Sequence, residues 1–285
     1  MSLFTINNMK HLLKRILHGY IPYYICRVFS PTSPCLKYYK YIKNNGYARH
    51  LFEFRGEYES LPITVEYDEE RNLHYVSNKQ GRKLYFRRGT PPHRIAKHYR
   101  ILAMEQDARS PHRYFDNPAE AEGTSFVDVG SAEGYTSLEI VDRVRHLYLF
   151  EADRQWLEAL EATFTPWKEK VTINPRRVGE RNTAGEVTLD AFFGGKDESS
   201  LFLKMDIEGA ERQALWGAKK LFSTQKLKFA ICTYHKDDCD VIPRLLETYP
   251  CTFIKQYGFF RNRLRCVVVR GQTNQCIDSP IADNH

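Results

Sequence analysis

The chain has 285 residues, of which 42% are hydrophobic and 27% charged, and its formal net charge is +7. This length accommodates one α/β domain with an extension, and the apolar content is that of a folded protein. No run of about eighteen apolar residues occurs, so we expect no membrane-spanning helix, and the N-terminus lacks the cleavage-site pattern of a signal peptide.

The seven cysteines are irregularly spaced and form no Cys-x-x-Cys pair. We therefore expect neither a structural zinc site nor a redox motif. Cysteine usage of this kind is typical of a reducing compartment, so the sequence predicts a cytoplasmic protein.

Positive charge is concentrated at the N-terminus, where residues 1–52 carry eight Lys and Arg and no Asp or Glu. Apolar residues recur there at the spacing of one helical face, at Met9, Leu12, Leu13, Ile16, Leu17 and Tyr20. A basic amphipathic helix of this kind predicts peripheral contact with an anionic membrane surface, such as the inner membrane face. The alternative is packing on its own domain or in a homodimer. No base-reading motif accompanies the charge, so we expect no nucleic-acid partner.

Along the chain we expect a basic helical segment, a small α+β segment, a main domain and a tail, at residues 1–60, 61–120, 121–271 and 272–285. The second segment begins with alternating apolar residues broken by polar turns, which is typical of a β-meander. It continues with a helical pattern between Pro91 and Pro111. We expect this segment to form a lid over the acceptor or the cofactor.

The main domain alternates short apolar runs with helical patterns, the latter at 135–145, 154–165, 209–222 and 238–248. This order predicts an α/β fold with a doubly wound, largely parallel sheet covered on both faces. The last two strands are joined by the short link 258–263, so we expect the final strand to be antiparallel. Ligands of such sheets bind beyond the carboxyl ends of the strands, near the point where the strand order reverses.

A glycine-rich turn follows the first strand, in the stretch FVDVGSAEGYTSLEI at 126–140. Gly130 allows a sharp turn, and Gly134 would let a ligand approach the start of the next helix, where free N–H groups favour negative charge. A dinucleotide fingerprint has a further glycine where Ala132 stands, which argues against an NAD-dependent enzyme. Such a turn is also a common structural device, so by itself it does not establish a cofactor site.

Glu151 follows the second strand, at the distance from the turn where an acidic residue accepts the ribose hydroxyls of a nucleotide cofactor. The alternative is that Glu151, with Asp153, only favours the dipole at the start of the next helix. A carboxylate at this position would repel the 2′-phosphate of NADP, so the sequence argues against NADP as the cofactor. The two strand ends together suggest a nucleoside cofactor without a demanding phosphate site, and S-adenosylmethionine fits.

The stretch LFLKMDIEGAERQALWGAKKLF, at 201–222, has a lysine inside an apolar strand and acids at the end of the strand. With the glycine-rich turn and the stretches LYLFEAD, VTLDAFF and ICTYHK, the chain resembles the FkbM family of S-adenosylmethionine-dependent methyltransferases over roughly residues 121–270. The resemblance implies a class I methyltransferase (Rossmann-like) fold and methyl transfer to a hydroxyl of a sugar or a secondary metabolite. It does not imply one substrate.

The predicted cofactor site comprises residues of the turn and of the strand ends: Asp128, Gly130, Ser131, Glu133, Gly134, Glu151, Glu180, Asn182 and Asp206. Within this set Glu180 and Asn182 are expected at the adenine edge, because they follow the third strand. His112 and Arg113 precede the first strand of the main domain and could close over the cofactor or the acceptor; the alternative is a basic loop in water.

The predicted catalytic residues are Asp206, His235 and Glu208, which lie at or just beyond the ends of the fourth and fifth strands. Removing the proton of a hydroxyl acceptor calls for a base, and we assign His235 to this role and Asp206 to positioning the acceptor. Asp206 could instead cap a helix, and His235 could lie in a surface loop. The same three residues could also hold a divalent cation, Mg or Mn. Lys204 is expected to pair with a neighbouring acid, because an unpaired buried ammonium is costly.

The sequence thus predicts an S-adenosylmethionine-dependent O-methyltransferase that acts on a sugar, a glycan or a lipid-linked saccharide in polysaccharide biosynthesis. Two alternatives remain, an NAD-dependent sugar-modifying oxidoreductase and a non-catalytic protein that retains the fold. The acceptor itself, and the choice between oxygen and nitrogen, are left open by the sequence.

Overall fold

The computed structural model describes residues 3–48, 50–260 and 262–276. The chain divides into two compact units: an N-terminal unit, Met1–Leu61 with Tyr257–Arg265, and a sheet unit, Pro62–Gln256 with the residues from Cys266 on. Of the tail expected at 272–285, residues 277–285 lie outside the described part of the chain. No helix among the described residues is both long and apolar enough to cross a bilayer.

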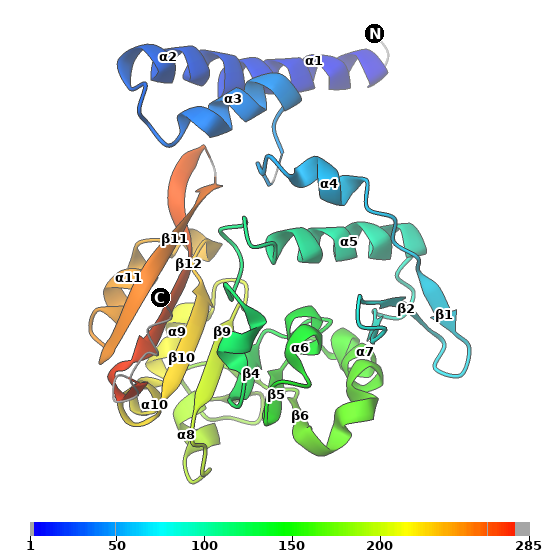
Figure 1. Cartoon of the computed structure of the whole chain (residues 1–285), viewed down its shortest axis with the longest axis vertical. Helices are drawn as coiled ribbons and strands as arrows, with labels where there is room; N and C mark the ends of the chain where they lie inside the picture. The colour runs from blue at the N-terminus through cyan, green and yellow to red at the C-terminus, as the bar shows by residue number, and fades with distance from the viewer. Residues whose placement is uncertain (1–2, 49, 261, 277–285) are drawn as a thin grey trace, which may run out of the picture. The chain divides into compact units, whose positions relative to one another are not determined.

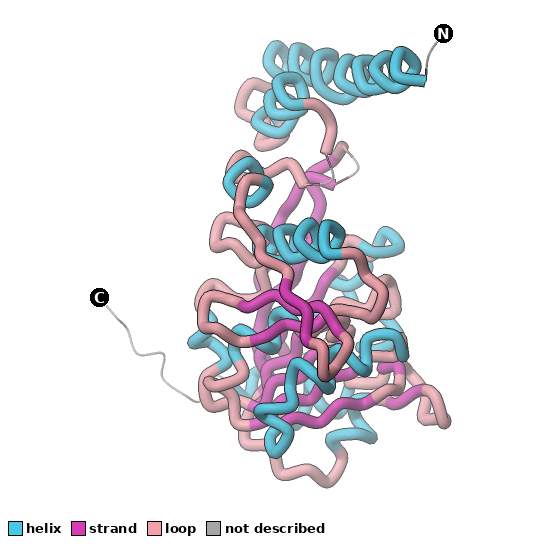
Figure 2. The backbone as a smooth tube through the Cα atoms, turned by 90° about the vertical axis from the view of Figure 1, so that its right-hand side faces the viewer, coloured by secondary structure: helices cyan, strands magenta, loops and turns pink. Residues whose placement is uncertain are grey.

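The N-terminal unit is helical. Helices α1 (Leu3–Arg15) and α2 (Ile21–Phe29) are joined by the π-helical turn η1 (Ile16–Tyr20), and α3 (Leu36–Asn45) and α4 (Arg55–Glu59) follow. Figure 2 shows α1, η1 and α2 as one continuous run of helix. The helix that the sequence predicts around residues 9–20 is therefore present.

Gly19 sets how closely η1 packs on α3. A Cβ atom at this position would lie 2.7 Å from the backbone nitrogen of Lys43, so only glycine allows the contact. Below it Ile42 is fully buried and clusters with Leu51 and Phe259.

The sheet unit begins with the small meander that the sequence predicts. Strands β1 (Glu66–Asp68), β2 (Leu73–Ser77) and β3 (Lys83–Tyr85) form an antiparallel sheet in that order. Helix α5 (Pro92–Glu105) and the 3₁₀ turn η2 (Pro118–Ala121) lead to the main sheet.

The main sheet has seven strands in the order β11-β12-β10-β9-β4-β5-β6 (Figure 1). Their bounds are Ser125–Val129 (β4), His146–Phe150 (β5), Val171–Asn174 (β6), Leu201–Met205 (β9), Leu227–Cys232 (β10), Cys251–Phe260 (β11) and Arg263–Thr273 (β12). The five neighbouring strands β10, β9, β4, β5 and β6 are parallel to one another, and β12 runs antiparallel to β10. The predicted doubly wound sheet with an antiparallel final strand is confirmed.

The remaining elements connect these strands or, in the case of η5, follow the last one. The helices are α6 (Tyr135–Ile140), α7 (Arg154–Phe164), α8 (Leu189–Phe193), α9 (Glu211–Trp216), α10 (Lys219–Thr224) and α11 (Val241–Leu246). The 3₁₀ turns are η3 (Thr165–Lys170), η4 (His235–Asp237) and η5 (Asn274–Cys276), and β7 (Arg177–Val178) pairs with β8 (Glu186–Val187).

The prediction of one helix over 209–222 is wrong, because α9 and α10 are separate. The Asp190 carboxylate accepts the backbone N–H groups of Lys220 and Leu221, at 3.0 and 2.8 Å, and so starts a new helix at α10. Gly217 ends α9, and a Cβ there would lie 2.1 Å from the Gly179 carbonyl oxygen.

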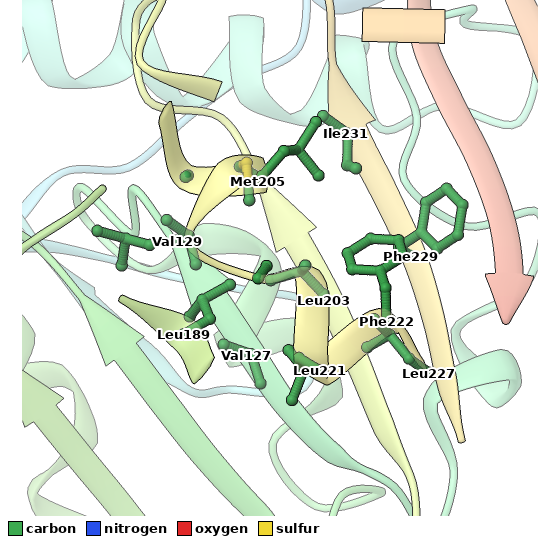
Figure 3. Packing of buried hydrophobic residues seen from close by; sticks show 14 of the residues in the cluster. Val127, Val129, Leu189, Leu203, Met205, Leu221, Phe222, Leu227, Phe229 and Ile231 are labelled. Atoms are coloured by element: carbon green, nitrogen blue, oxygen red, sulfur yellow. The ribbon is translucent and has the colours of Figure 1, made fainter. Parts of the chain in front are cut away.

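Alternate residues of each strand enter different cores on the two faces of the main sheet. One face packs against α8 to α11 and includes Val127, Val129, Leu203, Met205, Phe229 and Ile231 (Figure 3). The other packs against α5, α6 and α7 and includes Phe126, Leu147, Leu149 and Phe202. The strand order reverses between β4 and β9, so a ligand site is expected beyond the carboxyl ends of these two strands.

Candidate active site

The carboxyl ends of β4 and β9 are held in direct contact. The Asp206 N–H donates to the Val129 carbonyl oxygen at 2.9 Å. Gly130 follows with φ +82°, and a Cβ atom on it would lie 1.9 Å from the Asp206 carbonyl oxygen. Gly130 is therefore required both by its backbone conformation and by the approach of the neighbouring strand.

Gly134 has a packing reason of its own. It also has φ +82°, and a Cβ there would lie 2.7 Å from the Phe164 ring and 3.0 Å from Leu160, both on α7. The predicted reason, a ligand approaching the helix start, is thus not needed to explain this glycine.

A buried ion pair lies beneath the turn. Lys204 Nζ lies 2.7 Å from Asp128 Oδ1 and donates to the Gly130 carbonyl oxygen at 2.6 Å. Ser137 donates to the other Asp128 oxygen at 2.7 Å. Burial lowers the pKa of Lys204, but the charges of Asp128 and Asp206 outweigh it and the pKa is raised. The predicted partner for Lys204 is confirmed, and both Asp128 oxygens are engaged inside the fold, where they support the turn.

Glu151 faces the glycine-rich turn. One of its oxygens accepts the Ala132 N–H at 2.8 Å and the other accepts the Asp153 N–H at 2.7 Å. Burial raises the pKa of Glu151 although these hydrogen bonds oppose it. Asp153 provides the helix cap by accepting the Gln155 N–H at 3.0 Å. The role at the helix start therefore belongs to Asp153. Glu151 is held at the strand end where the sequence predicts a carboxylate that binds the ribose.

The other polar residues of the turn hold it in place. Ser131 is buried and donates to the Asp128 carbonyl oxygen at 2.9 Å. Glu133 is buried and lies 3.1 Å from His98 Nε2, on α5. Burial lowers the pKa of His98, but the hydrogen bond to Glu133 and its charge outweigh it and the pKa is raised. Helix α5 is thereby tied to the turn.

The three predicted catalytic residues lie together. His235 Nδ1 lies 3.6 Å from Asp206 Oδ1, and His235 Nε2 lies 3.4 Å from Glu208 Oε2. The His235 side chain is 11% exposed and that of Glu208 is 87% exposed, so the Nε2 side of the imidazole, where Glu208 lies, is the more open side.

Glu211 is a further member of this group. Its Oε1 accepts the Ile207 N–H at 2.9 Å and lies 3.2 Å from His235 Nδ1. Because a carboxylate oxygen only accepts, we assign the hydrogen of the neutral ring to Nδ1, where Glu211 and Asp206 lie, and the electron pair to Nε2, which faces the more exposed Glu208. Burial lowers the pKa of His235, but the hydrogen bond to Glu211 and the charge of Asp206 outweigh it, so the pKa is raised above 6.5. The sequence prediction gave Glu211 no role, although it is the last acid of the KMDIEGAE stretch.

The family model described as methyltransferase FkbM domain matches residues 90–259. The chain belongs to this family. The predicted resemblance to this family of S-adenosylmethionine-dependent methyltransferases is confirmed. The NAD-dependent alternative has no support from this match. No curated protein sequence matches the chain significantly.

Solved structures that match part of the chain include several methyltransferases. The FkbM methyltransferase of Methylobacillus flagellatus KT is 20% identical, with a TM-score of 0.43, over 64% of this chain and 55% of that one. The chain therefore spans little more than half the length of that protein. An rRNA methylase from Streptococcus thermophilus is 14% identical, with a TM-score of 0.38, over 55% and 92% of the two chains. TrmK from M. capricolum, solved in complex with S-adenosylhomocysteine, is 9% identical, with a TM-score of 0.40, over 55% and 66%.

Tyr114, which the sequence prediction passed over, comes from the loop before β4 and reaches one of the predicted catalytic residues. Its hydroxyl donates to Asp206 Oδ2 at 2.8 Å, and burial together with the Asp206 charge raises its pKa. His112, two residues earlier, packs edge-on against the Tyr234 ring at 5.2 Å. The guanidinium of Arg113 is instead engaged within its own loop, by Asp116 at 2.6 Å and the Ser110 carbonyl oxygen at 2.8 Å.

The predicted adenine-edge residues lie in the loop between β7 and β8. Asn182 Oδ1 accepts the Thr188 N–H at 3.0 Å and so shapes the loop. Glu180 is exposed, 3.5 Å from Arg181. These contacts explain the form of the loop, and the adenine role of both residues stays a prediction.

The residues present do not fit a hard divalent cation. Ligand atoms of Asp206, Cys232 and His235 lie within 4.8 Å of one another. Burial raises the pKa of the Cys232 thiol well above its usual range, and a protonated thiol is a poor ligand, whereas Mg²⁺ prefers oxygen ligands throughout. The predicted ligand set of Asp206, Glu208 and His235 is not gathered at one point either, because Asp206 faces His235 Nδ1 and Glu208 faces Nε2.

Proposed function

We propose that this methyltransferase methylates a hydroxyl oxygen of a sugar, a glycan or a lipid-linked saccharide. The observation that carries this proposal is the environment of His235, whose Nε2 is on the more open side of an imidazole fixed by Glu211. A hydroxyl must lose a proton in the reaction, and this arrangement provides a base for it.

When bound, S-adenosylmethionine supplies a methyl group on a positively charged sulfur, which is a good leaving group. The task left to the chain is to hold the acceptor oxygen in line and to take its proton. Glu151 and the turn at Gly130 would hold the ribose and the tail of the cofactor, since Glu151 is fixed by two backbone N–H groups.

His235 would accept the acceptor proton at Nε2. The imidazolium that forms lies between carboxylates, with Glu211 and Asp206 at Nδ1 and Glu208 at Nε2. These charges favour the protonated ring and so strengthen the base. Tyr114 orients Asp206 through its hydrogen bond, leaving the other Asp206 oxygen toward His235 and the acceptor.

Support for a saccharide acceptor is the aromatic surface beside the base. The Tyr234 ring lies 4.4 Å from the His235 ring and 5.2 Å from that of His112. Binding sites combine apolar and aromatic walls with a few polar groups, and a sugar offers both a C–H face and hydroxyls to such a site.

The test begins with the cofactor and then the acceptor. Saturation with S-adenosylhomocysteine near 100 times its dissociation constant adds about 2.7 kcal/mol of stability, which should raise the Tm by roughly 5–10 °C, whereas NAD should not. The purified chain is next incubated with S-adenosylmethionine and a panel of sugars, nucleotide sugars and amines, and release of S-adenosylhomocysteine is followed. A methyl ether product supports the proposal. An N-methyl product would overturn it, and binding without turnover of any acceptor would favour a non-catalytic protein.

A further inference from the structure

The continuous helix formed by α1, η1 and α2 has one face that packs within the N-terminal unit. On this face Arg15 donates to the Lys43 carbonyl oxygen at 2.6 Å, and Gly19 and Tyr23 are buried. The contacts are with α3, as the position of Gly19 against Lys43 shows.

The rest of this helix carries large apolar side chains in solvent. They are 37–80% exposed and comprise Met9, Leu12, Leu13, Ile16, Leu17, Tyr20, Ile21, Tyr24, Ile25, Val28 and Phe29. We call these residues the apolar band. Single exposed apolar residues are ordinary on protein surfaces, but a contiguous group marks an interaction site.

The spacing of the apolar band fits the unusual geometry of this helix. Its members recur every four residues, whereas a regular α-helix has 3.6 residues per turn, so a row spaced by four would drift around the helix axis. The π-helical turn η1 has i→i+5 hydrogen bonds and winds less per residue, which reduces this drift in the middle of the band. The wide turn thus helps to keep apolar side chains from α1 and α2 on a common side.

The helices α1 to α3, which carry and support the apolar band, have charges of one sign, while Glu53 and Glu59 of the same unit line a hollow with Leu12 and Lys14. Residues 1–52 contain no Asp or Glu. Lys10 and Lys14, one turn apart on α1, are exposed, as are Lys37 and Lys40 on α3. Lys43 lies over the rings of three tyrosines, 4.3 Å from the centroid of Tyr23. Long lysine side chains beside apolar surface can place their charge in a phosphate layer while their stems remain among apolar groups.

We propose that the apolar band lies in the interface of an anionic lipid bilayer, with the helix parallel to the membrane plane. Apolar area and lysines that face anionic headgroups both favour binding of such a helix. A second copy of the chain is a poorer partner, because it would bring the same lysines together without a carboxylate in the segment to pair with them. The inference does not depend on the proposed acceptor.

The experiment is co-sedimentation of the full chain with vesicles. One set contains phosphatidylcholine alone and the other phosphatidylcholine with phosphatidylglycerol. Binding is expected to the second set, and to weaken as salt is added, because salt screens the headgroup charge. Each lysine near an anionic surface contributes roughly fivefold in affinity, so Lys10→Gln/Lys14→Gln should bind roughly 25-fold more weakly. Leu13→Gln/Ile25→Gln should lose about tenfold or more, because apolar burial is removed without a change of charge.

Matched variants in the sheet unit serve as controls. Ile254→Gln removes an apolar side chain that is 61% exposed, and Lys219→Gln/Lys226→Gln removes two exposed lysines; neither should change vesicle binding. Stabilisation by S-adenosylhomocysteine is measured on every variant and shows that the sheet unit is folded. Because vesicle binding and cofactor binding are measured separately, failure of this proposal can be distinguished from failure of the proposed function. The proposal is overturned if the wild-type chain binds neither vesicle set, or binds both equally. It is also overturned if light scattering shows a dimer that Leu13→Gln/Ile25→Gln dissociates.

Discussion

Glu211 Oε1 lies 3.2 Å from His235 Nδ1, although Glu211 begins α9 and His235 follows β10. The same oxygen accepts the Ile207 N–H, so a backbone hydrogen bond fixes the carboxylate independently of the histidine. An imidazole held by a carboxylate at Nδ1 presents Nε2 as the base, the arrangement used in many general-base sites.

The first prediction concerns His235 itself. His235→Gln removes the base, and kcat should fall by about 10²–10⁴-fold, the range that a positioned base contributes. The dissociation constant of S-adenosylhomocysteine, measured by calorimetry, should change little because the ring is assigned to the acceptor side. His93→Gln replaces an exposed histidine on α5 and should leave kcat unchanged. Equal kcat values for the two variants would remove His235 from the mechanism.

The second prediction is the pH dependence of the reaction. The folded pKa of His235 is raised above 6.5, and only the neutral ring can accept a proton. Activity should therefore rise with pH through an acid limb whose midpoint lies above 6.5. Glu211→Gln removes one of the charges that raise the pKa, so the midpoint should move to lower pH.

The raised pKa of His235 also makes the free energy of unfolding depend on pH, and this contribution falls as pH rises whereas activity increases. A raised histidine pKa means that the folded state binds the proton more tightly, so this contribution is fully present below about pH 6.5 and is lost as pH rises through the folded pKa. Unfolding by urea at several pH values should show this loss in the wild type and a smaller loss in His235→Gln, in which His98, whose pKa is also raised, still contributes. Glu169→Gln, at a side chain that is 90% exposed, is the control for the Glu211 variant. An acid limb that does not move in Glu211→Gln would contradict the assigned pairing.

The third prediction tests the contact between the two strand ends. Gly130→Ala should destabilise by about 1–2 kcal/mol through its positive φ. A further 1–3 kcal/mol or so should come from the clash, because the new Cβ would meet the Asp206 carbonyl oxygen at 1.9 Å. Gly81→Ala is the matched control, since Gly81 has φ +77° but no atom within 4 Å of the added Cβ. The difference in Tm between the variants isolates the clash, and its absence would show that β4 and β9 do not meet this closely.

The sheet could be predicted because its signals are local. Short apolar runs, helical periodicity and the link at 258–263 each depend on neighbouring residues, and the strands, the meander and the final hairpin follow from them. The split between α9 and α10 could not be predicted in this way. It depends on Asp190, which lies 30 residues away from the N–H group of Lys220 that it accepts.

The site shows the same division. The proximity of Asp206, Glu208 and His235 could be predicted because they follow strand ends, where the topology gathers side chains. Tyr114 reaches Asp206 across 92 residues of sequence, from a loop with no periodic pattern. Its neighbours His112 and Arg113 carry the more conspicuous chemistry, yet the Arg113 guanidinium is engaged within its own loop by Asp116. The sequence analysis therefore selected the polar residues of this loop, His112 and Arg113, whereas the residue that reaches Asp206 is Tyr114.

The last prediction concerns the cofactor. The Glu151 carboxylate is oriented by the N–H groups of Ala132 and Asp153, and a ribose hydroxyl bonded to a charged group contributes about 1.5–3 kcal/mol. Glu151→Ala should therefore weaken S-adenosylhomocysteine binding by about tenfold or more in calorimetry. Glu161→Ala, an exposed position on α7, should bind as the wild type does. Comparison with S-methylthioadenosine separates the parts of the ligand, because it keeps the ribose but lacks the amino-acid tail. If Glu151 binds the ribose, both ligands should lose affinity by the same factor. A loss confined to S-adenosylhomocysteine would instead place Glu151 beside the tail.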